Sequence, residues 1–166
     1  SPITFSDKAL DKIKRRNTKV FSWYLDLNLL MNYWGSERVY HHTAPVNMLF
    51  ALNEGLKICR EEGLQNRFIR HEENGNYFDL KLKEMGIMPF VDKQKYVSLP
   101  MLKSIFIPKG IDDSSFRKNL LSRHNIEIGS GLGHTKGKIW RIGIMGHNSR
   151  KEVIDNLFNV LGLYIV

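Results

Sequence analysis

The sequence predicts a helical segment followed by a small α+β domain built on one sheet. Two long helical patterns, at residues 45–62 and 64–85, are each followed by a glycine that ends them. After Gly86 the spacing of the apolar residues changes, and short apolar or β-branched runs alternate with two further helical patterns. The resulting order of strand, strand, helix, strand, strand, helix is typical of an α+β layer.

Composition favours a globular protein and excludes several other classes. The chain has 166 residues, 42% of them hydrophobic and 11% aromatic, which suits one domain or two small lobes with a real core. No apolar run approaches the ~20 residues of a membrane span, and the polar first residues are unlike a signal peptide. The single cysteine, Cys59, excludes an internal disulfide framework and fits a reducing compartment.

The net charge is strongly positive, since 25 lysines and arginines against 17 acidic residues give +8. Such an excess favours anionic partners, among them nucleic acid, membrane surfaces and small anions. The densest basic run, Lys12 to Lys19, is either a binding patch or the solvated face of a short helix, where last-turn cations complement the helix dipole. We expect the second, and expect neither a nucleic acid nor a membrane as partner.

Residues 7–16 and 26–33 carry helical patterns ahead of the two long helices. The first has an apolar side and a basic side, whereas the second is apolar nearly all round and is stopped by Gly35. We therefore expect the second helix to be buried. The loop that follows, residues 36–44, is polar and aromatic together, and many of its side chains are able to donate hydrogen bonds.

The strands of the small domain are predicted from short runs between turn signals, at residues 87–91, 101–107, 126–128 and 139–145. Between them, Asp112 opens a helix that runs to about Arg123. Ser149 and Glu152 have the spacing of a capping box and precede a periodic apolar run, which predicts a closing amphipathic helix.

A glycine-rich loop at residues 129–137 leads into the last predicted strand, which carries Arg141 at its middle. The spacing of the glycines matches neither a Walker A loop nor the dinucleotide-binding pattern, so ATP and NAD are poor candidates. An arginine buried in a strand must be paired, because an isolated buried charge is very costly. Its partner is either Glu127 on a neighbouring strand or the carboxylate or phosphate of a ligand, and the pattern alone favours neither.

No metal site and no catalytic constellation stand out. His41 and His42 are adjacent, and on an extended chain they point to opposite faces. The other histidines and Cys59 show no metal-ligand spacing. The sequence also has no nucleophile elbow, triad order or close carboxylate pair, so these patterns alone do not reveal an enzyme.

Four motifs occur together and in order: Phe21-Ser-Trp-Tyr-Leu-Asp26, Tyr33-Trp-Gly35 with Tyr40-His-His-Thr43, Gly131-Leu-Gly133, and Trp140-Arg-Ile-Gly143. In these motifs, and along nearly its whole length, the chain resembles the C-terminal part of the alanine–glyoxylate (serine–pyruvate) aminotransferases. These are class V, fold-type I enzymes that depend on pyridoxal 5′-phosphate. The resemblance implies an α/β fold, with the helical remainder of the cofactor-binding large domain at residues 1–62. It also implies a small α+β domain with a mainly antiparallel sheet at residues 63–166.

The resemblance also implies roles for three residues. Tyr40 and Thr43 would donate their hydroxyls to the cofactor phosphate of the neighbouring subunit in a homodimer. Arg141 would hold the α-carboxylate of the amino-acid substrate, because its planar fork forms two parallel bonds with a carboxylate. No catalytic residue is expected here, because the family's Schiff-base lysine lies upstream of the matching segment. Residues 1–166 alone are therefore expected to be inactive.

The complete enzyme is expected to move an amino group from alanine or serine to glyoxylate or pyruvate. Transfer from 3-hydroxykynurenine or an aminophosphonate is an alternative within the superfamily. A non-catalytic dimerising module, or a basic module that binds anions or nucleic acid, is the alternative from another class. Animal relatives are often peroxisomal, but residues 164–166 lack a Ser-Lys-Leu-like signal, so a peroxisomal or cytoplasmic location is expected. Residues 21–34 are expected to expose apolar surface that the rest of a large domain would cover.

Overall fold

The computed structural model describes residues 3–165. By its internal contacts the chain divides into two compact units, residues 1–54 and residues 55–166. The predicted division into a large-domain remainder and a small domain at residues 62 and 63 remains a prediction.

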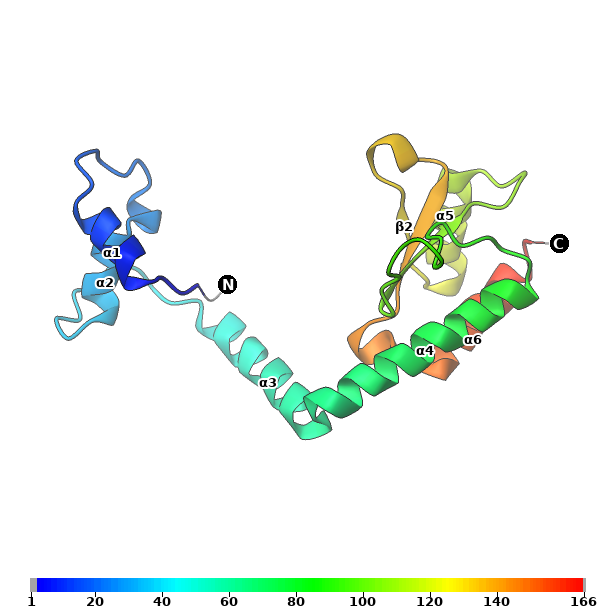
Figure 1. Ribbon diagram of the computed structural model, residues 1–166, viewed down its shortest axis with the longest axis horizontal. Helices are drawn as coiled ribbons and strands as arrows, with labels where there is room; N and C mark the ends of the chain where they lie inside the picture. The colour runs from blue at the N-terminus through cyan, green and yellow to red at the C-terminus, as the bar shows by residue number, and fades with distance from the viewer. Residues whose placement is uncertain (1–2, 166) are drawn as a thin grey trace. The chain divides into compact units, whose positions relative to one another are not determined.

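Figure 1 shows the helices and strands in chain order. Their bounds are α1 (Asp7–Lys14), η1 (Trp23–Leu25), α2 (Leu27–Trp34), α3 (Val46–Glu62), α4 (Leu64–Glu84), β1 (Leu102–Phe106), α5 (Asp113–His124), β2 (Gly129–Ser130), η2 (Gly133–Thr135), β3 (Ile139–Gly143), η3 (Gly146–Asn148) and α6 (Lys151–Leu161). Among residues 3–165, no helix combines the length and the apolar character that crossing a bilayer requires.

The first unit contains α1 and α2, and both begin at a side-chain cap. The Ser6 hydroxyl accepts from the Ala9 amide, and the Asp26 carboxylate accepts from the Asn28 amide at 3.0 Å. The expectation that the second helix is buried is wrong within this chain. No residue of α2 is buried, and Trp34 is 70% exposed, because α1 and the loop that follows α2 cover only part of its apolar surface. The apolar exposure expected for residues 21–34 is confirmed.

The two long helices form where the sequence predicts them, and a glycine separates them. Gly63 has a φ of +80°, a conformation that favours glycine, and its amide bonds to Cys59 O at the end of α3. The same residue then precedes the first turn of α4. Gly86, with a φ of +65°, follows the end of α4 in the same way. The positive φ at each glycine turns the chain out of the helix that it follows.

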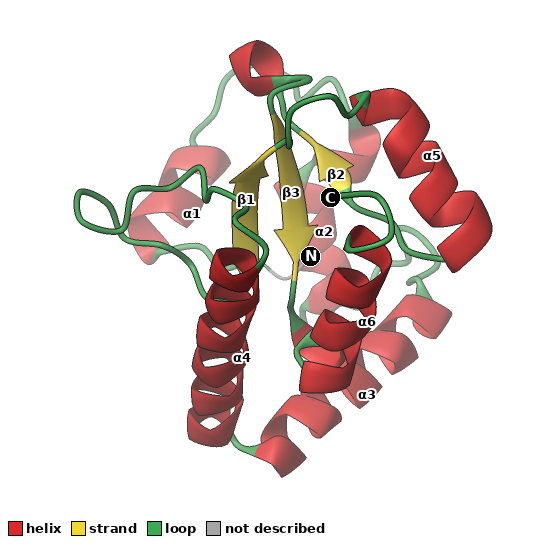
Figure 2. Cartoon of the chain, turned by 90° about the vertical axis from the view of Figure 1, so that its right-hand side faces the viewer, coloured by secondary structure: helices red, strands yellow, loops and turns green. Residues whose placement is uncertain are grey.

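The second unit is built on a three-stranded antiparallel sheet with the order β1-β3-β2. The longest strands, β1 and β3, pair along their full length, whereas β2 has only two residues. Strand β3 is therefore the central strand, and Figure 2 shows it between its two neighbours. The predicted mainly antiparallel sheet is confirmed.

Helices cover one face of this sheet. Successive strand residues point to opposite faces, and on β3 Trp140 and Ile142 belong to the core cluster, while Ile139 at the start of the strand is buried outside it. On β1 the buried residues are Lys103 and Ile105. The helices complete the core with apolar side chains from α4 (Phe78, Leu82), α5 (Phe116, Leu120) and α6 (Ile154, Leu157, Phe158, Leu161). Arg141 belongs to the other face of the sheet.

Two of the predicted strands are wrong. Residues 87–91 form only an isolated bridge between Pro89 and Ile105, flanked by bonds from Phe90 N to Ser104 O and from Phe106 N to Met88 O. Residues 126–128 do not pair at all. Helix α5 ends at Asn125 in the left-handed conformation, and the chain reaches β3 only at Gly129. Ile128 instead packs into the core.

The predicted capping box at Ser149 is also wrong. Helix α6 begins after Arg150, and no side chain caps it. Ser149 is fully buried, and its carbonyl oxygen accepts hydrogen bonds from Arg70 and Asn74 of α4. Tertiary contacts with α4 therefore decide the position of this serine, and the local capping pattern does not.

A part-buried polar contact joins β3 to α5. The indole Nε1 of Trp140 donates to the Asp113 carboxylate at 3.0 Å, and the Trp140 ring stacks on Phe116 with centroids 4.6 Å apart. Hydrogen bonds from Arg117 and then Trp140 hold the pKa of Asp113 below its ordinary value. The carboxylate therefore stays ionised and keeps accepting from the indole.

We expect Asp113→Ala to lower the free energy of unfolding by about 1–3 kcal/mol, because it leaves the buried Trp140 indole without an acceptor. Trp140→Phe removes the donor, so the two changes together should cost less than the sum of their separate costs. Urea denaturation of the two single variants and the double variant, followed by circular dichroism, measures this coupling. Strictly additive costs would show that the contact contributes nothing.

Candidate functional site

Arg141 lies at the middle of the central strand β3, on the face opposite the helices. The residues paired with it across the sheet are Ser104 on β1 and Gly129 on β2. Neighbouring side chains on one face of a sheet are close enough to touch, so a serine and a glycine leave the long arginine side chain unusual room. The strand therefore presents a half-buried guanidinium between two small residues.

The backbone of β2 holds one side of the Arg141 guanidinium. Its Nε donates to Ser130 O at 2.8 Å. A Cβ added at Gly129 would lie 3.4 Å from the Nη2 atom, so the glycine lets the guanidinium lie directly against the strand. Within residues 3–165 the Nη atoms have no hydrogen-bond acceptor. They are the atoms with which arginine forms a two-pronged contact to a carboxylate.

The predicted alternative, an ion pair between Arg141 and Glu127, is wrong. None of the carboxylates of residues 3–165 forms an ion pair with Arg141, whose hydrogen bond goes to the Ser130 carbonyl. Glu127 is exposed and lies in the unpaired stretch before β2. Since the expected strand at 126–128 does not form, the acid has no register that would bring it beside the arginine.

The glycine-rich loop between β2 and β3 is held by its own hydrogen bonds. Thr135 Oγ1 accepts from Leu132 N at 3.0 Å and donates to Leu132 O at 2.7 Å. Gly131 N donates to Ile139 O at 3.0 Å and so extends the pairing of β2 with β3. A Cβ at Gly131 would lie 2.1 Å from Thr135 O, so only glycine fits there. This closed loop follows Ser130 directly and fixes the carbonyl that orients Arg141.

Tyr40 and Thr43, the other two predicted site residues, lie in the first unit and face each other. Their hydroxyl oxygens are 3.0 Å apart. Both residues are exposed, and the exposed fraction of Tyr40 is 72%. Two exposed hydroxyls at this separation can donate together to one anionic group such as a phosphate.

The two histidines between them anchor this loop. His41 is buried, its ring stacks on Trp23 with centroids 3.9 Å apart, and its Nε2 donates to Trp23 O at 3.1 Å. The Nδ1 atoms of His41 and His42 are 2.8 Å apart, so the prediction that the two rings point to opposite faces is wrong. Tertiary contacts orient both rings, since His42 also packs against Tyr33 and Tyr24.

The histidines thus order the loop that carries Tyr40 and Thr43. In the part of the chain that the structure describes, no group of three or more histidine, cysteine, aspartate or glutamate side chains could hold a metal ion. The buried and stacked His41 fixes the backbone on which the hydroxyls of Tyr40 and Thr43 are presented.

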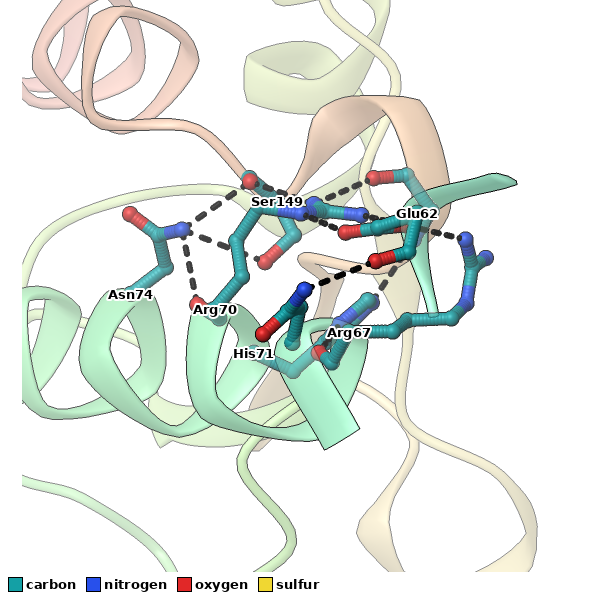
Figure 3. Close-up of polar contacts among 8 residues, drawn as sticks. Glu62, Arg67, Arg70, His71, Asn74 and Ser149 are labelled. Carbon is teal, nitrogen blue, oxygen red and sulfur yellow. Dashed lines mark hydrogen bonds and ion pairs between the residues drawn. The ribbon is translucent and has the colours of Figure 1, made fainter. Parts of the chain in front are cut away.

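Sequence reasoning missed a polar network at the junction of α3 and α4, which Figure 3 shows. The Glu62 carboxylate accepts from Arg70 Nε at 2.6 Å and Nη2 at 3.0 Å, and from Arg67 Nη1 at 2.9 Å. Arg70 Nη1 then donates to Gly146 O at 2.9 Å and to Ser149 O at 2.8 Å. The network therefore ties the junction to the segment that follows β3.

Two further residues of α4 complete this network. His71 Nδ1 lies 2.7 Å from Arg67 O and therefore donates, which leaves Nε2 to accept from Gly146 N at 2.9 Å. Asn74 donates to Ser149 O at 2.9 Å. Polar residues at 67, 70, 71 and 74 share one face of a helix by their spacing. That polar stripe is the signal by which the sequence shows the network.

The network around Glu62 leads us to expect a loss of folding stability at acid pH. The hydrogen bond from Arg70, with that from Arg67, lowers the pKa of Glu62 from 4.5 to about 2. A lowered carboxyl pKa stabilises the folded state above pH 4.5, and this stability is lost as the pH falls toward 2. The glutamine in Glu62→Gln cannot titrate, so the urea midpoint of this variant should lie below that of the parent protein at neutral pH. The difference between the two midpoints should become smaller as the pH falls from 4.5 toward 2. A gap of constant size would contradict this role for Glu62.

Comparison with known proteins identifies relatives of the chain in sequence and in structure. No family model matches the sequence. An alanine–glyoxylate aminotransferase from Callithrix jacchus is 41% identical over 93% of the chain and 38% of its own length. The structure of an alanine–glyoxylate aminotransferase from Nostoc sp. superimposes with a TM-score of 0.86 at 49% identity, over 96% of the chain and 42% of that protein. The chain is homologous to the C-terminal part of the alanine–glyoxylate aminotransferases.

The matches cover all or nearly all of this chain but only part of each relative. The chain spans about two fifths of the length of the relatives that it matches. A further relative, an (S)-ureidoglycine–glyoxylate transaminase from Bacillus subtilis, is 38% identical over 100% of the chain and 43% of its own length. These neighbours have the fold-type I architecture predicted from the sequence.

Proposed function

We propose that the complete protein carrying this chain is a pyridoxal-phosphate-dependent transaminase that moves an amino group from alanine or serine to glyoxylate or pyruvate. The observation that carries the proposal is the guanidinium of Arg141. It lies on a central strand, with Nε held by Ser130 and small residues on both sides. A carboxylate is the group that fits two parallel bonds from an arginine fork. All the proposed donors and acceptors carry one.

Arg141 supplies orientation in this reaction. Its two Nη atoms bind the substrate carboxylate, and the rest of the amino acid then has one position relative to the strand. Pyridoxal phosphate, when bound, supplies the electron sink for the chemistry at the α-carbon. The protein's contribution from this chain is to place that carbon, and placement of this kind accounts for a large part of enzymatic rate enhancement.

Tyr40 and Thr43 would hold the cofactor phosphate. The residues present fit this group, because their hydroxyls lie 3.0 Å apart on an exposed loop and neither is buried in the core of its own unit. The proposed assembly is a homodimer in which this loop serves the cofactor of the neighbouring subunit. The stacking of His41 on Trp23 restrains the loop, and such restraint lowers the entropy lost on binding.

Ureidoglycine is a second candidate for the amino donor. The Bacillus subtilis transaminase named for that donor is about as similar to this chain as the animal alanine–glyoxylate enzymes are. Glyoxylate is the acceptor in both names. The two candidates therefore differ in the donor, while Arg141 binds the carboxylate of either.

A substrate panel with the complete protein and pyridoxal phosphate tests the function. Alanine, serine and ureidoglycine are each offered with glyoxylate, and formation of glycine is measured. Transfer from alanine or serine supports the main proposal, and transfer from ureidoglycine alone replaces it with the second. If no donor forms glycine, the transaminase proposal is wrong.

The role of Tyr40 is tested by Tyr40→Phe. The loss of one hydrogen bond to a charged phosphate should weaken retention of the cofactor about tenfold or more, because such bonds contribute about 1.5–3 kcal/mol. Dialysis followed by absorbance of the bound cofactor measures retention. Tyr96→Phe, at an exposed tyrosine of the second unit, is the matched control and should retain the cofactor normally. Equal retention in both variants would remove Tyr40 from the phosphate site.

A further inference from the structure

A cavity of about 570 Å³ lies where the end of α3, the start of α4 and the segment before α6 come together. It is lined on one side by Ile58 and Cys59 of α3, and on the other by His147 and Arg150. A volume of this size is in the range of sites for small organic molecules. It lies wholly within the second unit, and Arg141 does not line it.

The charge of this cavity is unbalanced. Three guanidinium groups line it, those of Arg67, Arg70 and Arg150, whereas Glu62 is the one carboxylate among its lining residues. Glu62 is already shared between Arg67 and Arg70. Two positive charges are therefore left without a matching acid at the wall of a concave site, where field lines are focused.

The hydrogen bonds show which donors remain available. Arg70 uses Nε and Nη2 on Glu62 and Nη1 on two backbone carbonyls, so it serves the structure. Arg67 uses only Nη1 on Glu62, and its Nη2 lies against Gly146, 3.7 Å from where a Cβ there would be. Arg150 Nη2 bonds His147 Nε2 at 2.9 Å. Arg67 and Arg150 therefore each keep N–H groups for a ligand, and Arg67 is already fixed in place by Glu62.

We propose that this cavity binds a small organic oxyanion with two negative charges. Its charged group lies between Arg67 and Arg150, and its hydrocarbon part lies along Ile58. The shared chemistry is that of a phosphate monoester or a dicarboxylate, because both offer several acceptor oxygens to guanidinium forks. Two charges match the unbalanced charge of the wall.

The consequence of binding follows from where the two arginines are attached. Arg67 belongs to α4 directly after the junction at Gly63, and Arg150 belongs to the segment that continues from β3. A ligand held by both adds a bond between these segments, parallel to the bonds of Arg70. An anion that binds only the folded form stabilises the protein in proportion to the logarithm of its concentration.

Titration calorimetry tests this site in the complete protein with its cofactor bound. The background variant is Arg141→Ala, so that a carboxylate bound at Arg141 does not contribute. The probes are inorganic phosphate, glycerol phosphate and succinate, each at the same ionic strength set with chloride, which removes general screening. At least one probe should bind saturably with one site per chain. Whether the phosphates or succinate bind more tightly identifies the source of the oxyanion.

Arg150→Gln is the deciding variant, because Arg150 is exposed and its loss leaves the Glu62 network intact. It should raise the Kd of the bound probe about tenfold or more, as expected for the loss of charged hydrogen bonds. Arg123→Gln, an exposed arginine of α5 that does not line the cavity, is the control and should leave the Kd unchanged. The absence of saturable binding for every probe, or an equal Kd in Arg150→Gln and its parent, overturns the proposal.

Discussion

Replacing Arg141 by alanine in the complete protein is expected to lower kcat/KM for the amino donor by about 30- to 5000-fold and to raise KM. The loss of a charged hydrogen-bonded contact to a substrate carboxylate costs about 2–5 kcal/mol, which corresponds to this range. The contact orients the substrate as well as binding it. We therefore expect kcat to fall together with the rise in KM.

The measurement is steady-state kinetics with the donor that the substrate panel identifies. Arg141→Lys is the informative companion, because it keeps the charge and loses the two-pronged geometry, and it should recover only part of the lost rate. Folding should change little in either variant, since the described side chain of Arg141 makes one hydrogen bond, to the Ser130 carbonyl. An unchanged KM for the donor would remove Arg141 from the substrate site.

Gly131→Ala is expected to cost about 3 kcal/mol of stability, the upper part of the usual range for overpacking. The added methyl group would lie 2.1 Å from the backbone oxygen of Thr135, and neither atom is at the free end of a flexible side chain. The loop must open to admit it. Opening the loop moves Ser130, so the variant should also lose catalytic efficiency through the position of Arg141.

Gly55→Ala provides the matched comparison for this change. Gly55 lies within α3, and a Cβ added there meets nothing within 4 Å. The same chemical change at that position should stabilise the protein by about 0.5–1 kcal/mol, because alanine loses less backbone entropy than glycine in a helix. Thermal unfolding of both variants measures the contrast. Similar effects of the two substitutions would show that the loop adapts without strain.

The helices were predictable where the signals were local. Both long helices end where glycines adopt positive φ, and α5 begins at the predicted Asp112 cap. Each of these signals acts within a few residues of the helix end it marks. The central strand β3 was likewise predictable from an apolar run between glycines.

Two of the failures, at Ser149 and at residues 126–128, share a cause, which is that distant contacts decide between locally acceptable structures. Ser149 lies in a capping sequence, yet it is buried against α4, where its carbonyl oxygen accepts hydrogen bonds from Arg70 and Asn74. Residues 126–128 are apolar enough for a strand, but Ile128 packs into the core without pairing. No local pattern contains the information about which helix will face these residues.

The candidate site was predictable in its parts but not in its geometry. Sequence resemblance singled out Arg141, Tyr40 and Thr43, and their roles remain proposals. The small neighbours of Arg141, Ser104 and Gly129, depend on the register of the sheet, which only the structure supplies. The network around Glu62 depends on how α4 meets the segment after β3, so it could not be read from spacing beyond the polar stripe on α4.

The short strands of the sheet also govern how copies of the chain can associate. The outer edge of β1 is already occupied by residues 88–90, through bonds from Phe90 N to Ser104 O and from Phe106 N to Met88 O. Pro89 in that segment has no amide hydrogen that could bond to a further strand. The opposite edge, β2, has two residues before the loop begins. Within residues 3–165 this sheet therefore gives little template for edge-to-edge pairing with a second copy.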